Sequence, residues 1–433
     1  MRCHLTPAPR ELLATFPMGA KLVKIAIVDA YSTGRTLATA LQQRGVCLVH
    51  VQCASVVPDS LTRGFESSDF ARNLTATEDA AALADKLTHL GVQRVLAGSE
   101  SGVILTDTLN HLMGLPGNDY ATAASRRNKA LMAKTVSEAG LPVPNGRTFN
   151  DRSSAVAWYR KAAPEQVVVK PLTSAGTDNV HFCQSAREVD EACRAVLAAK
   201  TLYGEQNQSV LVQEQLNGVE YYINTVSDSG LHRVAEIWRY TKLRGPGGTP
   251  IYDYEEPVEA GSDEATPLRL LVPRVLKALG VVSGAAHTEV MMTARGAVLI
   301  ESGARLGGAT VPWVVEKYSG LSQTSLLVDS VVDPKYLVDF DETAVTWSGK
   351  VRNVAFVNRV SGRASAADWI GRIAVLPTVV EAVSSLSSGA TLRPTADLLS
   401  SPGFALLAAD DPKAVERDYR AIRAMEEVAL YTA

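Results

Sequence analysis

The chain has 433 residues and a mass of 46.2 kDa, which is too long for one hydrophobic core and predicts two to four lobes. Its net charge of −3 and pI near 6.2 argue against a general attraction to nucleic acid or anionic membranes, so neither is expected as a partner. The five cysteines form no C-x-x-C pair, and no apolar run approaches the roughly 20 residues that cross a bilayer. We therefore expect a cytoplasmic protein without a disulfide framework.

The first part of the chain predicts a leader followed by a doubly wound α/β domain. Residues 1–20 combine two arginines and three prolines with a very short apolar stretch, which is typical of a loose arm. Over residues 21–117, apolar runs at 24–29, 46–51 and 95–97 alternate with helical patterns, as parallel strands and their crossover helices do. The region lacks G-x-G-x-x-G, so no dinucleotide site is predicted.

Residues 118–335 predict a mixed α+β region. A helical pattern over 121–139 ends at Gly140, and two prolines prevent its continuation. A strand ending at Lys170, a polar loop, a helix near 185–199 and a strand over 210–213 come next, and strands near 286–293 and 297–302 flank a tight turn. Residues 336–433 are expected to form a C-terminal α+β domain, in which no chemistry is predicted.

The first candidate site follows the strand that ends at Lys170. A loop of small residues comes next and includes Ser174, Gly176 and Thr177. An ammonium group supplies a point charge for a triphosphate, and small side chains let backbone N–H groups approach phosphate oxygens. A strand that ends in solvent has the same pattern. Lys129, on the preceding helix, is by itself indistinguishable from a solvated surface lysine.

The second candidate segment spans residues 210–220. Its strand runs into a short linker at Glu214, Gln215 and Leu216, whose backbone groups can face an adenine edge. Glu220 lies far enough along to reach ribose hydroxyls. A plain β-hairpin with exposed acids is the alternative, and the segment alone favours it.

The strongest pattern pairs two acids across a turn. Glu289 and Glu301 lie on strands that an antiparallel register can set side by side. A few carboxylates together with nucleotide phosphates are the ligands that Mg²⁺ prefers. Arg305, followed by Gly307 and Gly308, is placed to balance anionic charge near such a metal. Surface ion pairing is the alternative for the two acids.

In this order, the motifs resemble the ATP-grasp superfamily over roughly residues 21–333. The resemblance rests on Asn128-Lys129, Val169-Lys170-Pro171, the 213–220 segment, and Glu289 with the 301–305 segment. It implies a pre-ATP-grasp α/β domain, a two-lobed ATP-grasp fold over 118–335, and the C-terminal domain of the L-amino-acid ligase branch.

The resemblance also implies the cofactors ATP and Mg²⁺ and a role for each motif residue. Lys129 and Lys170 would hold the phosphates beneath the loop that contains Ser174, Gly176 and Thr177; Glu214, Gln215 and Leu216 would line the adenine pocket; Glu220 would bind ribose; Glu289 and Glu301 would hold Mg²⁺; Arg305 would stabilise charge on an acyl phosphate; and Glu100, His287, Gly307 and Gly308 would face the substrates.

The implied reaction joins two L-amino acids into a dipeptide and releases ADP and phosphate. A homodimer is the assembly that the family suggests. A ligase that makes another amide, or a non-catalytic nucleotide-binding module, is the alternative. Arg305 weighs against the module, because a protein that only binds nucleotide does not need it.

Two positions depart from the family pattern. Gly303 stands where many members have asparagine, which leaves the number of bound metals open, and Asn179 stands where the phosphate loop commonly has glycine. Tyr254 and Glu255, which follow the glycine-rich residues 244–249, are expected in a mobile lid.

Overall fold

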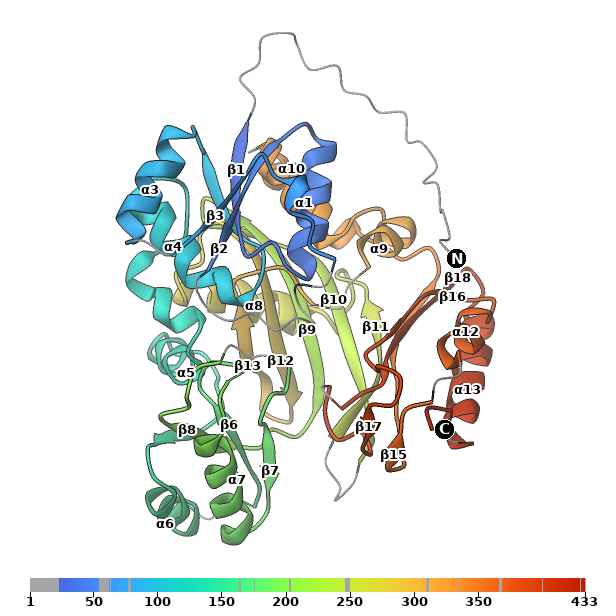
Figure 1. Ribbon diagram of the computed structural model, residues 1–433. Helices are drawn as coiled ribbons and strands as arrows, with labels where there is room; N and C mark the ends of the chain where they lie inside the picture. The colour runs from blue at the N-terminus through green and yellow to red at the C-terminus, as the bar shows by residue number, and fades with distance from the viewer. Residues whose placement is uncertain are drawn as a thin grey trace.

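The computed structural model describes residues 23–53, 62, 64–76, 79–162, 165–174, 176–201, 204–245, 250–308, 311–333, 335–365, 368–398, 400–428 and 430–432. The expected leader over 1–20 and the glycine-rich residues 246–249 lie outside them. Figure 1 shows a parallel sheet at the top, a smaller lobe at the bottom, and a large sheet between them that reaches the C-terminal helices. In the described part of the chain, no helix is both long enough and apolar enough to cross a membrane.

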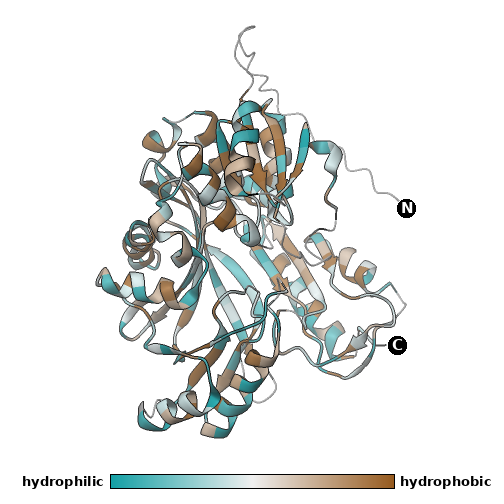
Figure 2. Cartoon of the chain, turned by 60° about the vertical axis from the view of Figure 1, so that its left-hand side comes forward, coloured by the Kyte–Doolittle hydropathy of each residue, from teal (hydrophilic) through white to brown (hydrophobic). Residues whose placement is uncertain are grey.

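The N-terminal sheet has the order β3-β2-β1-β4, and all its strands are parallel. Ile25 and Ile27 of β1 belong to one hydrophobic core, whereas Ala26 and Val28 belong to another. Both faces of the strand are therefore covered, as its continuous apolar run predicts, and the apolar colour gathers on these strands in Figure 2. The predicted doubly wound α/β fold is confirmed. Its elements are β1 (Lys24–Val28), α1 (Thr33–Gln43), β2 (Cys47–Gln52), η1 (Ser67–Asp69), β3 (Arg72–Thr75), α3 (Ala80–His89), β4 (Arg94–Ala97), η2 (Glu100–Gly102) and α4 (Val103–Leu112).

The small lobe is an antiparallel sheet of order β5-β8-β6-β7, packed against two helices. Val167 and Val169 of β6 contact Val189 and Val196 of α7 in one core, so the other face of the strand is left for the site. The elements are β5 (Gly146–Phe149), α6 (Arg152–Ala162), β6 (Val167–Pro171), β7 (His181–Cys183), α7 (Ala186–Ala198) and β8 (Val210–Glu214).

The central sheet has eight strands in the order β13-β12-β9-β10-β11-β14-β18-β16. Strands from the predicted C-terminal region continue it, because β14 pairs with β11. The central elements are β9 (Val219–Asp228), β10 (Leu231–Arg244), β11 (Pro250–Val258), α8 (Thr266–Ala278), β12 (Gly284–Thr293), β13 (Gly296–Gly303), α9 (Pro312–Ser319), α10 (Gln323–Val332), α11 (Tyr336–Asp339) and η5 (Glu342–Ala344). The C-terminal elements are β14 (Lys350–Ala355), β15 (Gly362–Arg363), α12 (Trp369–Ala374), β16 (Val379–Ser384), β17 (Thr391–Leu392), β18 (Gly403–Ala409) and α13 (Pro412–Glu427).

Two local expectations are wrong. The helix expected over 121–139 is divided into η3 (Tyr120–Arg126) and α5 (Lys129–Glu138), because the side chain of Asn128 accepts hydrogen bonds from the N–H groups of Ala130 and Leu131 and so begins a new helix. Tyr254 and Glu255 do not belong to a lid. They lie in β11, where Glu255 is paired with Tyr240 on one side and Asn353 on the other.

Candidate functional site

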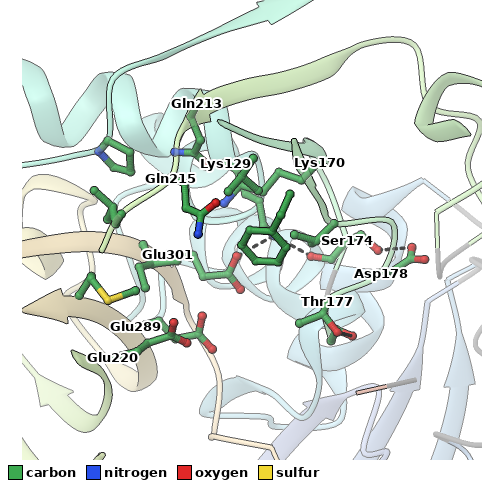
Figure 3. Close-up of a pocket in the computed structure, with 18 of the residues that line it drawn as sticks. Lys129, Lys170, Ser174, Thr177, Asp178, Gln213, Gln215, Glu220, Glu289 and Glu301 are labelled. Carbon is green, nitrogen blue, oxygen red and sulfur yellow. Dashed lines mark hydrogen bonds and ion pairs between the residues drawn. The ribbon is translucent and has the colours of Figure 1, made fainter. Parts of the chain in front are cut away.

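A cavity of about 170 Å³ is lined by residues of both the small lobe and the central sheet. It is lined by all eleven residues predicted to hold ATP or Mg²⁺: Lys129, Lys170, Ser174, Gly176, Thr177, Glu214, Gln215, Leu216, Glu220, Glu289 and Glu301. We call it the first cavity. Figure 3 shows the two lysines and the loop on one side and the three acids facing them.

The lysines come from different elements. Lys170 is the penultimate residue of β6 and is buried, with 7% of its surface exposed. Burial lowers the pKa of its ammonium group to about 8, although the nearby Glu301 carboxylate opposes the shift. Lys129, the first residue of α5, donates to the Ser174 carbonyl oxygen at 2.7 Å and lies 3.0 Å from Glu301 Oε2. The structure therefore gathers both lysines, the loop and one acid in one charged cluster.

The positions of the acidic side chains are set by the pairing of their strands. Glu289 of β12 and Glu301 of β13 are direct Cα partners, because a β-bulge between Glu289 and Val290 shifts the register by one residue from the one that begins at the turn. Burial acts to raise the pKa of Glu289, but the hydrogen bond and charge of His287, together with the charges of Lys242 and Lys129, outweigh it and the pKa falls. Glu220 of β9 lies in the register position opposite Met291, and its Oε2 accepts from Lys242 Nζ at 2.7 Å. Burial raises the pKa of Glu220, against the effect of this lysine.

The strand end at 214–216 has backbone groups with different partners. The N–H groups of Glu214 and Gln215 donate to the carbonyl oxygens of Asn145 and Gln166. In the described part of the chain, the N–H of Leu216 has no such partner. The buried Oε1 of Gln213, which also lines the cavity, accepts no hydrogen bond from the described residues. A donor and an acceptor therefore remain at this edge for a heterocycle.

The residues predicted to form a phosphate loop are held by polar contacts. Ser174 Oγ donates to Asp178 Oδ2 at 2.7 Å, and Thr177 Oγ1 accepts from the N–H of Leu398 at 3.2 Å. Thr177 and Asn179 both have positive φ angles, of 61° and 53°. Asn179 therefore occupies the left-handed conformation for which glycine is the usual residue, and asparagine tolerates it better than most side chains do.

A second cavity, of about 420 Å³, adjoins the first and shares Glu289 and Glu301 with it. Of the predicted substrate residues, Glu100, His287 and Gly308 line it, as does Arg305. Gly307 does not. A Cβ there would lie 2.8 Å from the Asn224 side chain and 3.1 Å from His287, so this glycine allows the loop to pack behind His287.

Several residues that line the second cavity lie outside the motifs from which the site was predicted. Four tyrosines and Phe404 form much of its wall, and the tyrosines are Tyr222, Tyr240, Tyr252 and Tyr254. Asn353 of β14 also lines it and donates to Glu255 Oε1 at 2.6 Å. Burial raises the pKa of Glu255 to about 7, against the hydrogen bonds from Tyr222 and Asn353.

The sequence offered a weak signal for one missed residue. By strand alternation Lys242 falls on the same face of β10 as the buried Trp238, and it pairs with Glu220. The sequence gives no such signal for Asn353 or Phe404. They reach the site only because the C-terminal strands pair with the central sheet.

A scan against protein-family models matches residues 163–312 to the ATP-grasp domain. Dapdiamide A synthase from Enterobacter agglomerans is 32% identical over 420 residues, which cover 93% of this chain and 95% of that protein. The crystal structure of an L-amino acid ligase from Bacillus licheniformis superposes with a TM-score of 0.72 at 20% identity, covering 94% of this chain and 98% of that one. A carboxyaminoimidazole ribonucleotide synthase from Aspergillus clavatus complexed with ATP gives a TM-score of 0.68 at 12% identity, covering 94% and 99%.

Proposed function

The chain belongs to the ATP-grasp family of carboxylate–amine ligases, and from this membership we propose that it joins two L-amino acids through an acyl phosphate, with release of ADP and phosphate. The observation that carries the proposal is the pair of adjoining cavities. The first gathers the cations that suit a triphosphate, the second is large enough for amino-acid side chains, and Glu289 and Glu301 lie at their junction.

The first cavity fits ATP. Lys129 and Lys170 supply two positive charges. Gln213 Oε1, which has no hydrogen-bond partner among the described residues, and the Leu216 N–H supply an acceptor and a donor for adenine. Glu220 is proposed to face the ribose. Its carboxylate already contacts Lys242, so a ribose hydroxyl would join an existing ion pair.

The acids at the junction fit Mg²⁺ bound together with phosphate oxygens. Within the described residues, no group of three or more His, Cys, Asp or Glu side chains gathers to hold a metal by protein ligands alone. Glu289 and Glu301 therefore match a site completed by nucleotide phosphates. Bound there, Mg²⁺ would neutralise charge during phosphoryl transfer.

In the proposed reaction, a carboxylate oxygen of the first amino acid attacks the γ-phosphorus, and the bond to ADP breaks. The amine of the second amino acid then attacks the acyl carbon, and phosphate leaves with that oxygen. Arg305 is proposed to stabilise the oxygens that gain negative charge in both steps, as a planar guanidinium does well.

The second cavity favours a substrate that bears an ammonium group. Glu255 is a half-buried acid that lines this cavity, and the described residues place no lysine or arginine in an ion pair with it. The tyrosine rings around it can also attract a cation through their faces. We propose that Glu255 binds the ammonium group of an amino-acid substrate.

A phosphate-release assay with a panel of amino-acid pairs, combined with mass spectrometry of the products, tests the proposal. Dipeptide formed in proportion to phosphate supports it. An amide from another amine class would assign the chain to a different ATP-grasp ligase, and ATP binding without turnover would assign it to a regulatory module. Light scattering tests the proposed homodimer.

A further inference from the structure

The carboxylate of Glu100 is held between two arginines from different parts of the chain. Its Oε1 accepts from Arg127 Nη1 at 2.6 Å, and its Oε2 accepts from Arg305 Nε at 2.9 Å. Glu100 begins η2, which follows a strand of the N-terminal sheet, whereas Arg127 precedes α5 and Arg305 follows β13. The three side chains are 12–17% exposed, so the contacts are shielded from water. A side chain of the N-terminal α/β domain thus reaches the candidate active site.

The contact with Glu100 helps to fix one edge of the Arg305 guanidinium group. Nε is engaged by Glu100, and Nη1 donates to the Leu306 carbonyl oxygen at 2.9 Å. In the described part of the chain, Nη2 has no hydrogen-bond partner, and Arg305 lines the second cavity beside Glu301. Because a guanidinium group is planar, holding two of its nitrogens sets the direction of the third.

Gly303 provides the room for this arrangement. A Cβ at position 303 would lie 2.9 Å from Glu100 Oε2 and 3.5 Å from Arg305 Cζ. Any side chain there would displace the Glu100 carboxylate or the arginine. The glycine that departs from the family pattern therefore stands where the Glu100–Arg305 contact needs space.

We propose that Glu100 is a positioning residue, which holds Arg305 so that its free Nη2 faces the reacting oxygens, and that Gly303 is required for this contact. The proposal rests on the proposed function, and it assigns Glu100 to the arginine rather than to a substrate. Burial acts to raise the pKa of Glu100, but Arg127 and Arg305 outweigh it and lower the pKa to about 2. The carboxylate therefore stays charged at any pH at which the enzyme would be assayed.

A purely structural role is the competing explanation, in which Glu100 only docks the N-terminal domain. The chain offers a matched control. Asp228 Oδ1 accepts from Arg94 Nη2 at 3.0 Å, and this ion pair also joins the N-terminal sheet to the central sheet, but neither residue lines the first or second cavity. Asp228→Asn should therefore affect docking without moving Arg305.

The test compares Glu100→Ala, Gly303→Ala, their double variant and Asp228→Asn in the full-length protein. We expect Glu100→Ala to lower kcat by tenfold or more with KM for ATP within about twofold, and Glu100→Gln, which keeps an acceptor oxygen, to be less impaired. Gly303→Ala should lower kcat in the wild-type background and add nothing in the Glu100→Ala background. Asp228→Asn should lower Tm but leave kcat unchanged.

A crystal structure of Glu100→Ala gives a readout that does not depend on activity. The proposal predicts that Arg305 changes its side-chain conformation there. An unchanged Arg305, a folded Glu100→Ala variant with wild-type kcat, or fully additive effects of the two substitutions would overturn the proposal. Failure of the wild-type protein to form any amide contradicts the proposed function instead, and the position of Arg305 in the variant still decides the role of Glu100.

Discussion

Lys129 Nζ lies 3.0 Å from Glu301 Oε2, so a lysine proposed to hold phosphate contacts an acid proposed to hold metal. The same ammonium group donates to the Ser174 carbonyl oxygen, in the loop proposed to cover the phosphates. We propose that these two side chains would exchange partners on ligand binding. Lys129 would then hold phosphate, and Glu301 would hold Mg²⁺.

Glu301→Gln keeps the shape of the side chain and removes its charge. We expect activity to fall by several orders of magnitude with Tm almost unchanged, because the amide is a poor ligand for Mg²⁺. Excess Mg²⁺ should restore part of the activity. Glu138→Gln, at a surface pair with Lys134, is the control and should retain full activity. A loss of Tm with normal kcat would instead mean that Glu301 is structural.

Arg305→Lys keeps the charge and loses the planar fork. If Arg305 interacts most strongly with developing charge, kcat should fall by more than KM for ATP rises. Steady-state kinetics at varied ATP separates the two parameters. An unchanged kcat beside a raised KM would place Arg305 in ground-state binding of ATP.

Lys170→Ala should weaken ATP binding and turnover by roughly tenfold or more, because it removes a cation from a partly desolvated cleft. Lys134 lies on α5 but is exposed and pairs only weakly with Glu138, at 3.9 Å, so Lys134→Ala should change little. Calorimetric titration with ATP measures both. Equal losses in the two variants would show that the phosphate site is elsewhere.

Replacing Glu255 should have opposite effects on the stability of the protein and on its binding of substrate. Its pKa in the folded protein is raised to about 7, so ionisation in the folded state is unfavourable, and the cost to stability grows as pH rises from the unfolded value of 4.5 through 7. Glu255→Gln should therefore raise Tm at pH 8 but not at pH 5. The same variant should raise KM for an amino-acid substrate at pH 8, because the ammonium group loses its partner. A variant that gains stability with no change in KM would leave Glu255 without the proposed role.

The parts of the site that depend on local pattern could be predicted. The turn between β12 and β13 is short, so the antiparallel pairing of the two strands that carry Glu289 and Glu301 could be predicted. The β-bulge next to Glu289, which makes these two residues direct partners, could not. The lysine at the end of β6 followed from a buried apolar run that ends in a charge.

The parts that depend on distant pairing could not be predicted. The hydrogen bond from Asn353 to Glu255 exists because β14 pairs with β11. No pattern in the intervening hundred or so residues predicts that these two strands pair. The break at Asn128 was missed for another reason. Its capping hydrogen bonds compete with a helical pattern that continues on both sides, and the pattern alone favours one long helix.

An oxygen-transfer measurement tests the acyl phosphate most directly. The protein is supplied with ATP and a pair of amino acids, one of which has both carboxylate oxygens labelled with ¹⁸O. A parallel reaction carries the label on the other amino acid. We predict ADP and amide in equal amounts, with one ¹⁸O atom from the acyl donor in each phosphate released. Label recovered in AMP, with pyrophosphate in place of phosphate, would contradict an acyl phosphate.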